Sequence, residues 1–259
     1  MKNLIFIVMH KQYKVPNKLP YKSIAVGANK NTFETNYKDD AGKENIASKN
    51  STYCELTAHY WVWKNIANDY DNIGLNHYRR YFGNSKLQRT KLLQDNKITK
   101  YLKKYDIILP EPWYWKMTVA EKYYVDGWGR KKDILTTREA IKKYYPDYLN
   151  AFDVIMKQNH ASYCNMFITN RENFIKYSKW LFKILGYVEK NTDISNYTPE
   201  EQRVFGYLSE LLLNVWVHKN KLRIKYLPMI QKELPLGYKI KSNIKFFLIK
   251  RIYSKSSKG

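Results

Sequence analysis

"NLIFIVMHK", residues 3–11, is a continuous apolar stretch that runs directly into His10 and Lys11. An uninterrupted apolar run of this length is typical of a strand buried on both faces of a parallel sheet. Its polar end is equally informative, because open α/β sheets bind their ligands at the carboxyl ends of their strands. The stretch therefore predicts a central strand with a functional tip.

Two further strand patterns end in a similar way. "SIAVGA" (residues 23–28) reaches Gly27 and is followed by a polar loop over residues 29–50, while "NIGLNHYRRYF" (residues 72–82) contains His77, Arg79 and Arg80. If these strands are parallel, their tips meet at one edge of the sheet. Arginine offers planar multidentate donors and lysine a point charge, so the edge suits a diphosphate.

Two simpler interpretations stay open at this point. Arg79 and Arg80 are also consistent with surface ion pairs to Asp69 or Asp71, and His10 alone is consistent with an ordinary exposed or satisfied histidine. Spacing does not decide between these interpretations and a phosphate site.

The rest of the chain alternates between helical and strand patterns. Thr52 and Glu55 form a capping-box pattern, and Thr198-Pro199-Glu200-Glu201 is a helix-start signal. Residues 111–130, rich in Tyr and Trp, indicate an irregular flap. The alternation predicts an α/β fold with a largely parallel sheet. Helices are expected over residues 52–67, 92–104, 134–144, 147–158, 171–189 and 198–219, and further strands over residues 105–110 and 162–168.

The last of these helices carries a second face beside its apolar stripe of Val204, Leu208, Leu211, Leu212 and Val215. Helical spacing places Arg203, Tyr207, Glu210 and Asn214 together on that face. A carboxylate beside an arginine and an aromatic ring suits work on a sugar hydroxyl. A solvated polar face explains the same spacing.

Charge is unevenly distributed along the 259 residues. The chain has 46 Lys and Arg against 23 Asp and Glu, a net charge of +23, and 12 of the basic residues with one acid lie from Lys219 onward. An excess of this size favours an anionic partner. We expect one domain over residues 1–228 and a basic amphipathic tail over 229–259, which suits an anionic membrane surface or, alternatively, a disordered solubilising segment.

Several classes of protein find no support in the sequence. Two cysteines are too few for a disulfide framework, and no stretch resembles a signal peptide or a membrane span. We therefore expect a cytoplasmic protein. Asp69-Tyr70-Asp71 precedes its strand, at the end opposite the polar tips, so we expect no protein metal site there; there is no zinc spacing, Walker loop or nucleophile elbow.

With these residues in view, the sequence resembles the DUF4422 family, glycosyltransferase-like proteins of bacterial capsule, exopolysaccharide and O-antigen gene clusters. The resemblance covers roughly residues 4–227 and rests on several pieces in one order. They are "HKQY", "IAVGA", "ENIASKNSTYCELTAHYWVWKN", "IGLNHYRRYF", "YDIILP", "YPDYLNAFD", "YCNMFI" and "EEQRVFGYLSELLLNVWV".

The resemblance implies a GT-A-like (Rossmann-like) nucleotide-sugar-binding fold with a C-terminal helical and basic extension. It implies a hexosyltransferase that moves a hexose, galactose from UDP-galactose, onto a growing, polyprenyl-diphosphate-linked glycan at the inner face of the cell membrane. It assigns the nucleotide side to His10, Lys11, Gly27, Asn45, Ser48, Asn50 and His77. It assigns substrate contacts to Asn165, Gln202, Arg203 and Asp133.

Catalysis is assigned to three residues. Arg79 and Arg80 stand where many GT-A enzymes carry metal-binding aspartates, so we expect them to neutralise the leaving diphosphate, with Glu210 as general base. No cofactor is firmly implied, and Mn²⁺ or Mg²⁺ stays an alternative without a well-placed Asp-x-Asp pair. Rival interpretations are a basic nucleic-acid-binding protein, which is not expected, and a catalytically inactive sugar-nucleotide-binding protein.

Overall fold

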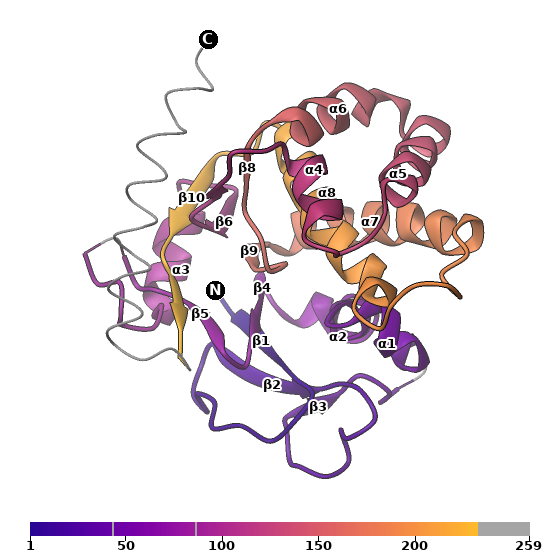
Figure 1. Cartoon of the computed structure of the whole chain (residues 1–259). Helices are drawn as coiled ribbons and strands as arrows, with labels where there is room; N and C mark the ends of the chain where they lie inside the picture. The colour runs from indigo at the N-terminus through magenta and orange to yellow at the C-terminus, as the bar shows by residue number, and fades with distance from the viewer. Residues whose placement is uncertain (43, 86, 233–259) are drawn as a thin grey trace. The chain divides into compact units, whose positions relative to one another are not determined.

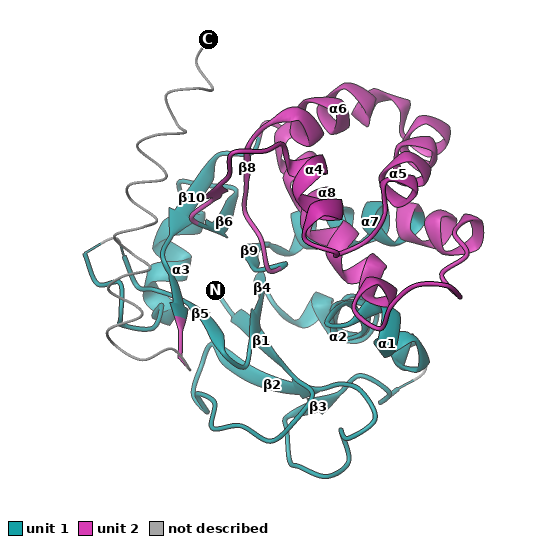
Figure 2. Cartoon of the chain, viewed as in Figure 1, with its two compact units in different colours: residues 1–110, 165–183, 222–230 teal, residues 111–164, 184–221, 231–259 magenta. Residues whose placement is uncertain are grey.

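The computed structural model describes residues 1–42, 44–85 and 87–232 (Figure 1). The chain divides into two compact units, which are described separately (Figure 2). The first comprises residues 1–110, 165–183 and 222–230, and the second comprises residues 111–164 and 184–221 with residues 231 and 232. The basic tail predicted over residues 229–259 lies outside the described residues from 233 onward.

The first unit is built on a nine-stranded sheet. Its main order is β10-β6-β9-β4-β1-β2-β3, and β5 pairs with both β4 and β11. The neighbours β10–β6, β4–β1, β1–β2 and β2–β3 are parallel, whereas β9 runs antiparallel to both β4 and β6. The predicted α/β fold with a mostly parallel sheet is confirmed. The strands are β1 (Asn3–Met9), β2 (Tyr21–Ala25), β3 (Tyr37–Lys38), β4 (Asn72–His77), β5 (Arg80–Phe82), β6 (Ile107–Pro110), β9 (Phe167–Asn170), β10 (Ile224–Leu227) and β11 (Met229–Gln231).

The register of the three parallel strands fixes where their polar tips lie. Met9 of β1 is opposite Ala25 of β2, and Val8 is opposite His77 of β4. The Val26 N–H continues the ladder by donating to the Met9 carbonyl at 2.8 Å. The carboxyl ends of β1, β2 and β4 therefore meet at one edge of the sheet, as their sequences predict.

Aromatic side chains pack one face of this sheet against helices. Every residue of β1 is buried, and Phe6 contacts His59 of α2 (Leu56–Asn65) and Phe174 of α7 (Arg171–Asn191), each at 6.5 Å between ring centroids. The opposite face carries Asn3, whose amide donates to the Asp95 carboxylate of α3 (Asp95–Leu102) at 2.9 Å. Burial of such rings supplies the main favourable term in folding.

The helix expected over residues 52–67 is wrong at its start. The chain forms η1 (Ala47–Lys49) and the short α1 (Asn50–Tyr53), and Cys54 then adopts a φ of +51° before α2 begins. A left-handed residue of this kind cannot continue a right-handed helix. Thr52 donates to the Lys49 carbonyl, so the expected Thr52–Glu55 capping box is absent. A further turn, η2 (Ala67–Asp69), precedes β4.

The second unit is mainly helical with a small β7–β8 pair. The irregular flap expected over residues 111–130 is wrong in part, because it contains β7 and α4, and Thr118 and Glu121 form a reciprocal capping box at the start of α4. None of the helices in the described part of the chain combines the length and hydropathy needed to span a bilayer. The elements are β7 (Trp113–Tyr114), α4 (Val119–Val125), α5 (Lys131–Tyr144), η3 (Pro146–Tyr148), α6 (Leu149–Lys157), β8 (His160–Ala161), η4 (Glu201–Arg203) and α8 (Val204–Lys219).

Two boundaries near the candidate site differ from the sequence prediction. The strand expected over residues 162–168 begins only at Phe167, since Cys164 and Asn165 have φ values of +72° and +49° and turn the chain. The helix predicted from Thr198 does have the expected reciprocal bonds between Thr198 and Glu201. Its first turn is the 3₁₀ helix η4, however, and α8 begins at Val204.

Candidate functional site

A cluster of cationic and aromatic side chains lies at the carboxyl ends of β1 and β4. It is centred on Tyr78 and comprises His10, Lys11, Tyr13, Tyr78 and Arg79, called the Tyr78 cluster below. His10 Nε2 lies 3.3 Å from the Tyr78 hydroxyl, and the Tyr13 ring lies 5.2 Å from the Tyr78 ring. Lys11 Nζ and Arg79 Cζ lie 5.9 and 5.0 Å from the centroid of that ring.

A tight β-hairpin holds this cluster in place. His77 of β4 pairs with Arg80 of β5, so Tyr78 and Arg79 form the turn between the two strands. The Tyr78 N–H donates to the Val8 carbonyl at 3.2 Å. Tyr78 is only 4% exposed, whereas His10 and Lys11 are exposed. The turn thus presents cations around a fixed ring.

Ion pairing of these arginines with the upstream aspartates, the alternative left open by the sequence, is wrong. Asp71 accepts a hydrogen bond from the Lys2 N–H at 2.7 Å, at the start of β1, and Asp69 lies in η2 before β4. These carboxylates and Arg79 are therefore at opposite ends of the same strand. The expectation that the Asp69–Asp71 pair lies away from the polar tips is confirmed.

A second group of polar side chains lies beyond the end of β2. Gly27 has a φ of +81°, and a Cβ atom there would lie 2.9 Å from Asn50 Oδ1. The Asn50 amide donates to Thr57 Oγ1 at 3.1 Å, and the Thr57 hydroxyl donates to Asp39 Oδ2 at 2.6 Å. Lys30 Nζ lies 3.7 Å from the other Asp39 oxygen. Gly27 and Asn50, both predicted on the nucleotide side, are thus brought together.

Asp39 is the residue of this group that sequence reasoning missed. It is fully buried directly after the two-residue β3, and burial is the main cause that raises the pKa of its carboxyl, against the opposing effects of Thr57 and Lys30. The available signal was the Asp39-Asp40 pair within a long polar loop. Carboxyls whose pKa is shifted by burial and a neighbouring charge are found at functional sites more often than elsewhere.

Three further residues were predicted on the nucleotide side, of which Asn45 and Ser48 lie close to Asn50 in the chain. Asn45 is exposed and its Oδ1 accepts a hydrogen bond from the Ala47 N–H at 3.2 Å. Ser48 is exposed in η1, two residues before Asn50. His77 is partly buried at the end of β4. Their roles stay predictions.

Asn165, the predicted sugar contact, is tied to α2 within the first unit. Its amide donates to Glu55 Oε1 at 2.8 Å, and the side chain is 3% exposed. Glu55 is the residue before α2, in the place where a capping box was expected. The carboxylate therefore holds the left-handed turn that leads into β9.

Within the second unit, Glu210 and Asn214 fix the segment that precedes that turn. Glu210 Oε2 accepts a hydrogen bond from the Cys164 N–H at 2.7 Å. One turn further along α8, the Asn214 amide exchanges two hydrogen bonds of 2.9 Å with the backbone of Ser162. Of the helix face predicted from periodicity, Arg203 is exposed, whereas Tyr207, Glu210 and Asn214 are partly buried.

Arg203 and Gln202 lie at the start of α8. Arg203 is exposed, and its Nη1 donates to Glu200 Oε1 at 3.0 Å and to the Tyr207 hydroxyl at 3.1 Å. The Tyr207 hydroxyl also hydrogen-bonds Glu200. Gln202 donates to the Tyr197 carbonyl at 3.3 Å. Substrate contact by either residue stays a prediction.

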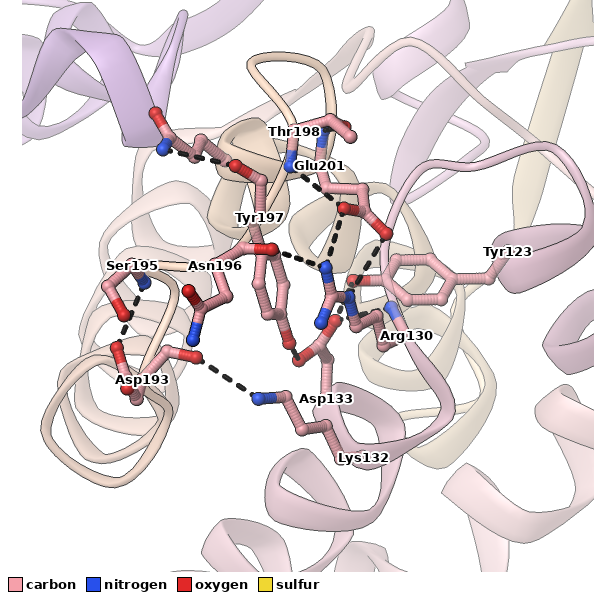
Figure 3. A network of polar contacts seen from close by, with 11 residues as sticks. Tyr123, Arg130, Lys132, Asp133, Asp193, Ser195, Asn196, Tyr197, Thr198 and Glu201 are labelled. Carbon is pink, nitrogen blue, oxygen red and sulfur yellow. Dashed lines mark hydrogen bonds and ion pairs between the residues drawn. The ribbon is translucent and has the colours of Figure 1, made fainter.

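Asp133, the last predicted substrate contact, is at the centre of a buried network (Figure 3). Its carboxylate accepts hydrogen bonds from the Arg130 N–H at 2.6 Å, from the Tyr123 hydroxyl at 3.2 Å and from Tyr197 at 2.5 Å. The Arg130 guanidinium donates to both oxygens of Glu201. These hydrogen bonds are the main reason that the pKa of the Glu201 carboxyl is lowered to about 2. These contacts hold α5 against the segment before α8, and the substrate role of Asp133 gains no support from them.

The residues at the strand tips do not fit a divalent cation. Such ions are held by carboxylates and other oxygen ligands, whereas Arg79 lies in the turn after β4 and Arg80 begins β5. Within residues 1–42, 44–85 and 87–232, no three His, Cys, Asp or Glu side chains gather as a metal site would require. The chemistry of the turn instead suits an anion.

Comparison with known proteins places these observations in a family. The model of DUF4422, a domain of unknown function, matches residues 4–221. A solved structure described as the WbbM bifunctional glycosyltransferase in its apo form matches with 28% identity and a TM-score of 0.82. The match covers 90% of this chain and 46% of that one, so this chain spans less than half of its relative. No curated protein matches in sequence.

Two fungal structures are more distant. Core-mannan synthase A from Aspergillus fumigatus, solved in an Mn/GDP form, is 10% identical over 81% of this chain and 64% of its own, with a TM-score of 0.35. The mannosyltransferase Ktr4p from S. cerevisiae is 11% identical over 81% of this chain and 61% of its own, with a TM-score of 0.34. Scores this low support no inference about function. The GT-A-like fold and the transferase class predicted from the sequence agree with the likeness to WbbM.

Proposed function

Because this chain belongs to the DUF4422 family, we propose that it is a glycosyltransferase that uses a UDP-hexose, UDP-galactose, as its donor. The acceptor is a growing cell-surface glycan carried on a polyprenyl diphosphate. The fold it shares with a bifunctional glycosyltransferase supports the transferase class. The donor, the acceptor and the site residues come from the resemblance described above and from the chemistry of the strand tips.

The observation that carries the proposal is the Tyr78 cluster. His10, Lys11 and Arg79 surround one buried ring at the carboxyl edge of parallel strands, where α/β sheets bind nucleotides. Arginine and lysine there suit the two phosphates of UDP. Arg80 follows in β5, and Gly27 with Asn50 lies beyond the neighbouring strand.

We propose different roles for these residues in sugar transfer. The bond between the anomeric carbon and the β-phosphate oxygen breaks, and negative charge grows on the UDP diphosphate. Positioned cations such as Arg79 and Lys11 stabilise that charge, which is often the largest catalytic contribution. A new bond forms to the acceptor oxygen, and the Glu210 carboxylate accepts the proton of that hydroxyl if transfer inverts the anomeric centre.

The proposed chemistry assigns no step to a metal ion, so we propose that transfer does not need one. Turnover of UDP-galactose that is abolished by EDTA and restored by Mn²⁺ would overturn this part. Turnover unchanged by EDTA supports it.

Calorimetric titration with UDP, UDP-galactose and UDP-glucose tests the function itself. We expect saturable binding to the nucleotide diphosphate, with release of UDP when donor and acceptor are supplied together. Binding without turnover would identify an inactive sugar-nucleotide-binding protein. A salt-sensitive complex with RNA and no binding of UDP would favour the nucleic-acid-binding alternative.

We further propose that the chain docks on the inner face of the cell membrane through its basic tail. This tail lies outside the described residues from 233 onward. Sedimentation with anionic liposomes should be lost when residues 238–259 are deleted. Unchanged sedimentation would favour a solubilising tail.

A further inference from the structure

The second unit contains a continuous chain of aromatic ring contacts that the proposed chemistry does not use. Its members come from β7, the residue directly after β7, the segments before α5 and after β8, and α8. We call this set the aromatic platform, and it consists of Trp113, Trp115, Trp128, Tyr163 and Tyr207.

The rings meet in defined geometries. Trp128 stacks on Tyr207, with centroids 5.5 Å apart and planes 14° apart. Trp128 also meets Tyr163 nearly edge-on at 5.6 Å, and Tyr163 contacts Trp113 at 5.8 Å and Trp115 at 6.2 Å. One phenol thus joins three indoles that come from two separate parts of the chain.

Burial distinguishes this set from a hydrophobic core. Tyr163 is 3% exposed, but the three indoles and Tyr207 are only partly buried. The rings of the α2–α7 packing behave differently, since Phe6 and Phe174 are fully buried. Contiguous large rings left partly in contact with solvent are typical of surfaces that bind a ligand.

Charged groups border the platform. Lys122 Nζ lies 4.0 Å above the centroid of Trp115 and 5.7 Å from that of Trp128. Arg203 Cζ lies 5.2 Å from the Tyr207 ring. The Glu210 carboxylate binds the Cys164 N–H, directly after Tyr163 in the chain. Apolar faces are thus combined with cationic and anionic hydrogen-bonding groups.

This combination matches one ligand chemistry. A hexopyranose has an apolar C–H face and a rim of hydroxyls that both donate and accept hydrogen bonds. Aromatic faces cover the first, and groups such as Lys122, Arg203 and Glu210 suit the second. An anionic lipid surface fits less well, because Asp126, bonded to Lys122, and Glu200, bonded to Tyr207, add negative charge to the border.

We propose that the aromatic platform binds a hexopyranose ring of the acceptor glycan, with Trp128 and Tyr207 as its central contact. The assignment rests on the proposed function, since it is Glu210, the proposed general base, that borders Tyr163. It adds acceptor-binding residues that neither the sequence motifs nor the diphosphate chemistry identify.

Saturation-transfer NMR with methyl β-D-galactopyranoside and methyl β-D-glucopyranoside tests the platform. The wild-type protein should transfer saturation to the C–H protons of at least one probe. Trp128→Ala should weaken binding about tenfold, the scale of one lost ring contact, and Trp128→Phe should restore much of it. Trp63→Phe is the matched control, because Trp63 stacks on Phe182 in the first unit.

Several results would overturn the platform. One is that the wild-type protein transfers no saturation to either probe. Another is that Trp128→Ala transfers as much saturation as the wild type. If Trp128→Ala does not fold, Tyr207→Leu removes the stacking partner from α8 instead, and unchanged binding by that variant has the same meaning.

Calorimetry with UDP on the same wild-type sample separates this inference from the proposed function. Binding of UDP without transfer to the glycosides overturns the platform alone. Transfer that depends on Trp128, without binding of UDP, keeps the platform as a sugar site and overturns the nucleotide-sugar function.

Discussion

Asn50 Oδ1 lies 2.9 Å from the position that a Cβ atom on Gly27 would occupy. The Asn50 side chain has little freedom to withdraw, because its amide donates to the Cys54 carbonyl at 2.8 Å and to Thr57 at 3.1 Å. Gly27 also has a φ of +81°, a conformation that side-chain-bearing residues rarely adopt. Two independent constraints therefore require glycine at the end of β2.

We predict that Gly27→Ala lowers the free energy of unfolding by about 2–4 kcal/mol, of which backbone strain alone supplies about 1–2 kcal/mol. Gly127→Ala is the matched control, since Gly127 has a φ of +71° but no atom within 4 Å of the position that its Cβ would occupy. Urea denaturation of both variants measures the difference. If both variants lose the same free energy of unfolding, the Asn50 side chain moves away from the new Cβ at no cost. Backbone strain then explains the whole effect.

Arg79 provides the most direct test of the diphosphate site. Its guanidinium lies over Tyr78 at the carboxyl edge of the sheet. We predict that Arg79→Gln raises the Kd for UDP by roughly tenfold or more, because a charge-assisted hydrogen bond is worth about 1.5–3 kcal/mol. Calorimetry at two salt concentrations provides the measurement. The affinity of the wild type for UDP should fall more steeply with salt than that of Arg79→Gln.

Arg171→Gln removes the same charge elsewhere and serves as the control. Arg171 lies at the opposite edge of the sheet, where it donates to the Asn68 carbonyl at 2.8 Å and its N–H to the Asp71 carbonyl. Its Kd for UDP should stay close to the wild-type value. Equal weakening by the two variants would mean that overall charge, and not the Tyr78 cluster, attracts the nucleotide.

The parts of the fold that the sequence predicts well are those set by apolar periodicity. The run over β1 and the stripe Val204, Leu208, Leu211, Leu212 and Val215 of α8 are all buried as expected. The meeting of His10, Lys11 and Arg79 follows from the same argument, because parallel strands place their carboxyl ends together. Local pattern and global fold agree at these positions.

The parts that the sequence does not predict depend on contacts between distant residues. The capping pattern of Thr52 and Glu55 is overridden because the Glu55 carboxylate binds Asn165, 110 positions away. The left-handed turn at Cys164 and Asn165 has only a weak local signal, since asparagine tolerates a positive φ but cysteine rarely adopts one. Each residue is bonded within its own unit: the Cys164 N–H donates to Glu210, and the Asn165 side-chain amide donates to Glu55.

Glu210 has a structural contact that must be separated from its proposed catalytic role. We predict that Glu210→Gln lowers kcat by about 10²-fold or more, the usual scale for loss of a general base. The fold should persist, since the glutamine carbonyl can still accept from the Cys164 N–H. Steady-state kinetics with UDP-galactose, together with a thermal melt, measure both quantities.

Asn214→Ala is the matched control for this prediction. It removes the neighbouring contacts of α8 with Ser162 but leaves the carboxylate in place. It should reduce stability more than it reduces kcat. If Glu210→Gln keeps the full rate, or if both variants lose rate in proportion to stability, Glu210 acts only by positioning the segment.

His59 links the buried aromatic packing of the first unit to pH. It is 1% exposed, and its Nε2 lies 2.8 Å from the Ser178 hydroxyl, which itself donates to the Phe174 carbonyl. Because the Ser178 hydroxyl proton is used in that bond, His59 Nε2 donates to the Ser178 oxygen. Burial lowers the pKa of His59 from the ordinary 6.5 to about 3.

We predict that this histidine makes the folded state less stable in mild acid. Between pH 6.5 and pH 3 the unfolded chain binds a proton at this histidine and the folded chain does not. The free energy of unfolding therefore falls as the pH falls through this range, and His59 does not reduce it above pH 6.5. From pH 7 to 5.5 it should remove about 1 kcal/mol from the free energy of unfolding. Urea denaturation at both pH values should show this loss in the wild type and in His218→Gln, the control at an exposed histidine. His59→Phe keeps a ring but cannot titrate, so its loss of stability should be smaller by about 1 kcal/mol. The same pH dependence in all three proteins would show that His59 does not cause it.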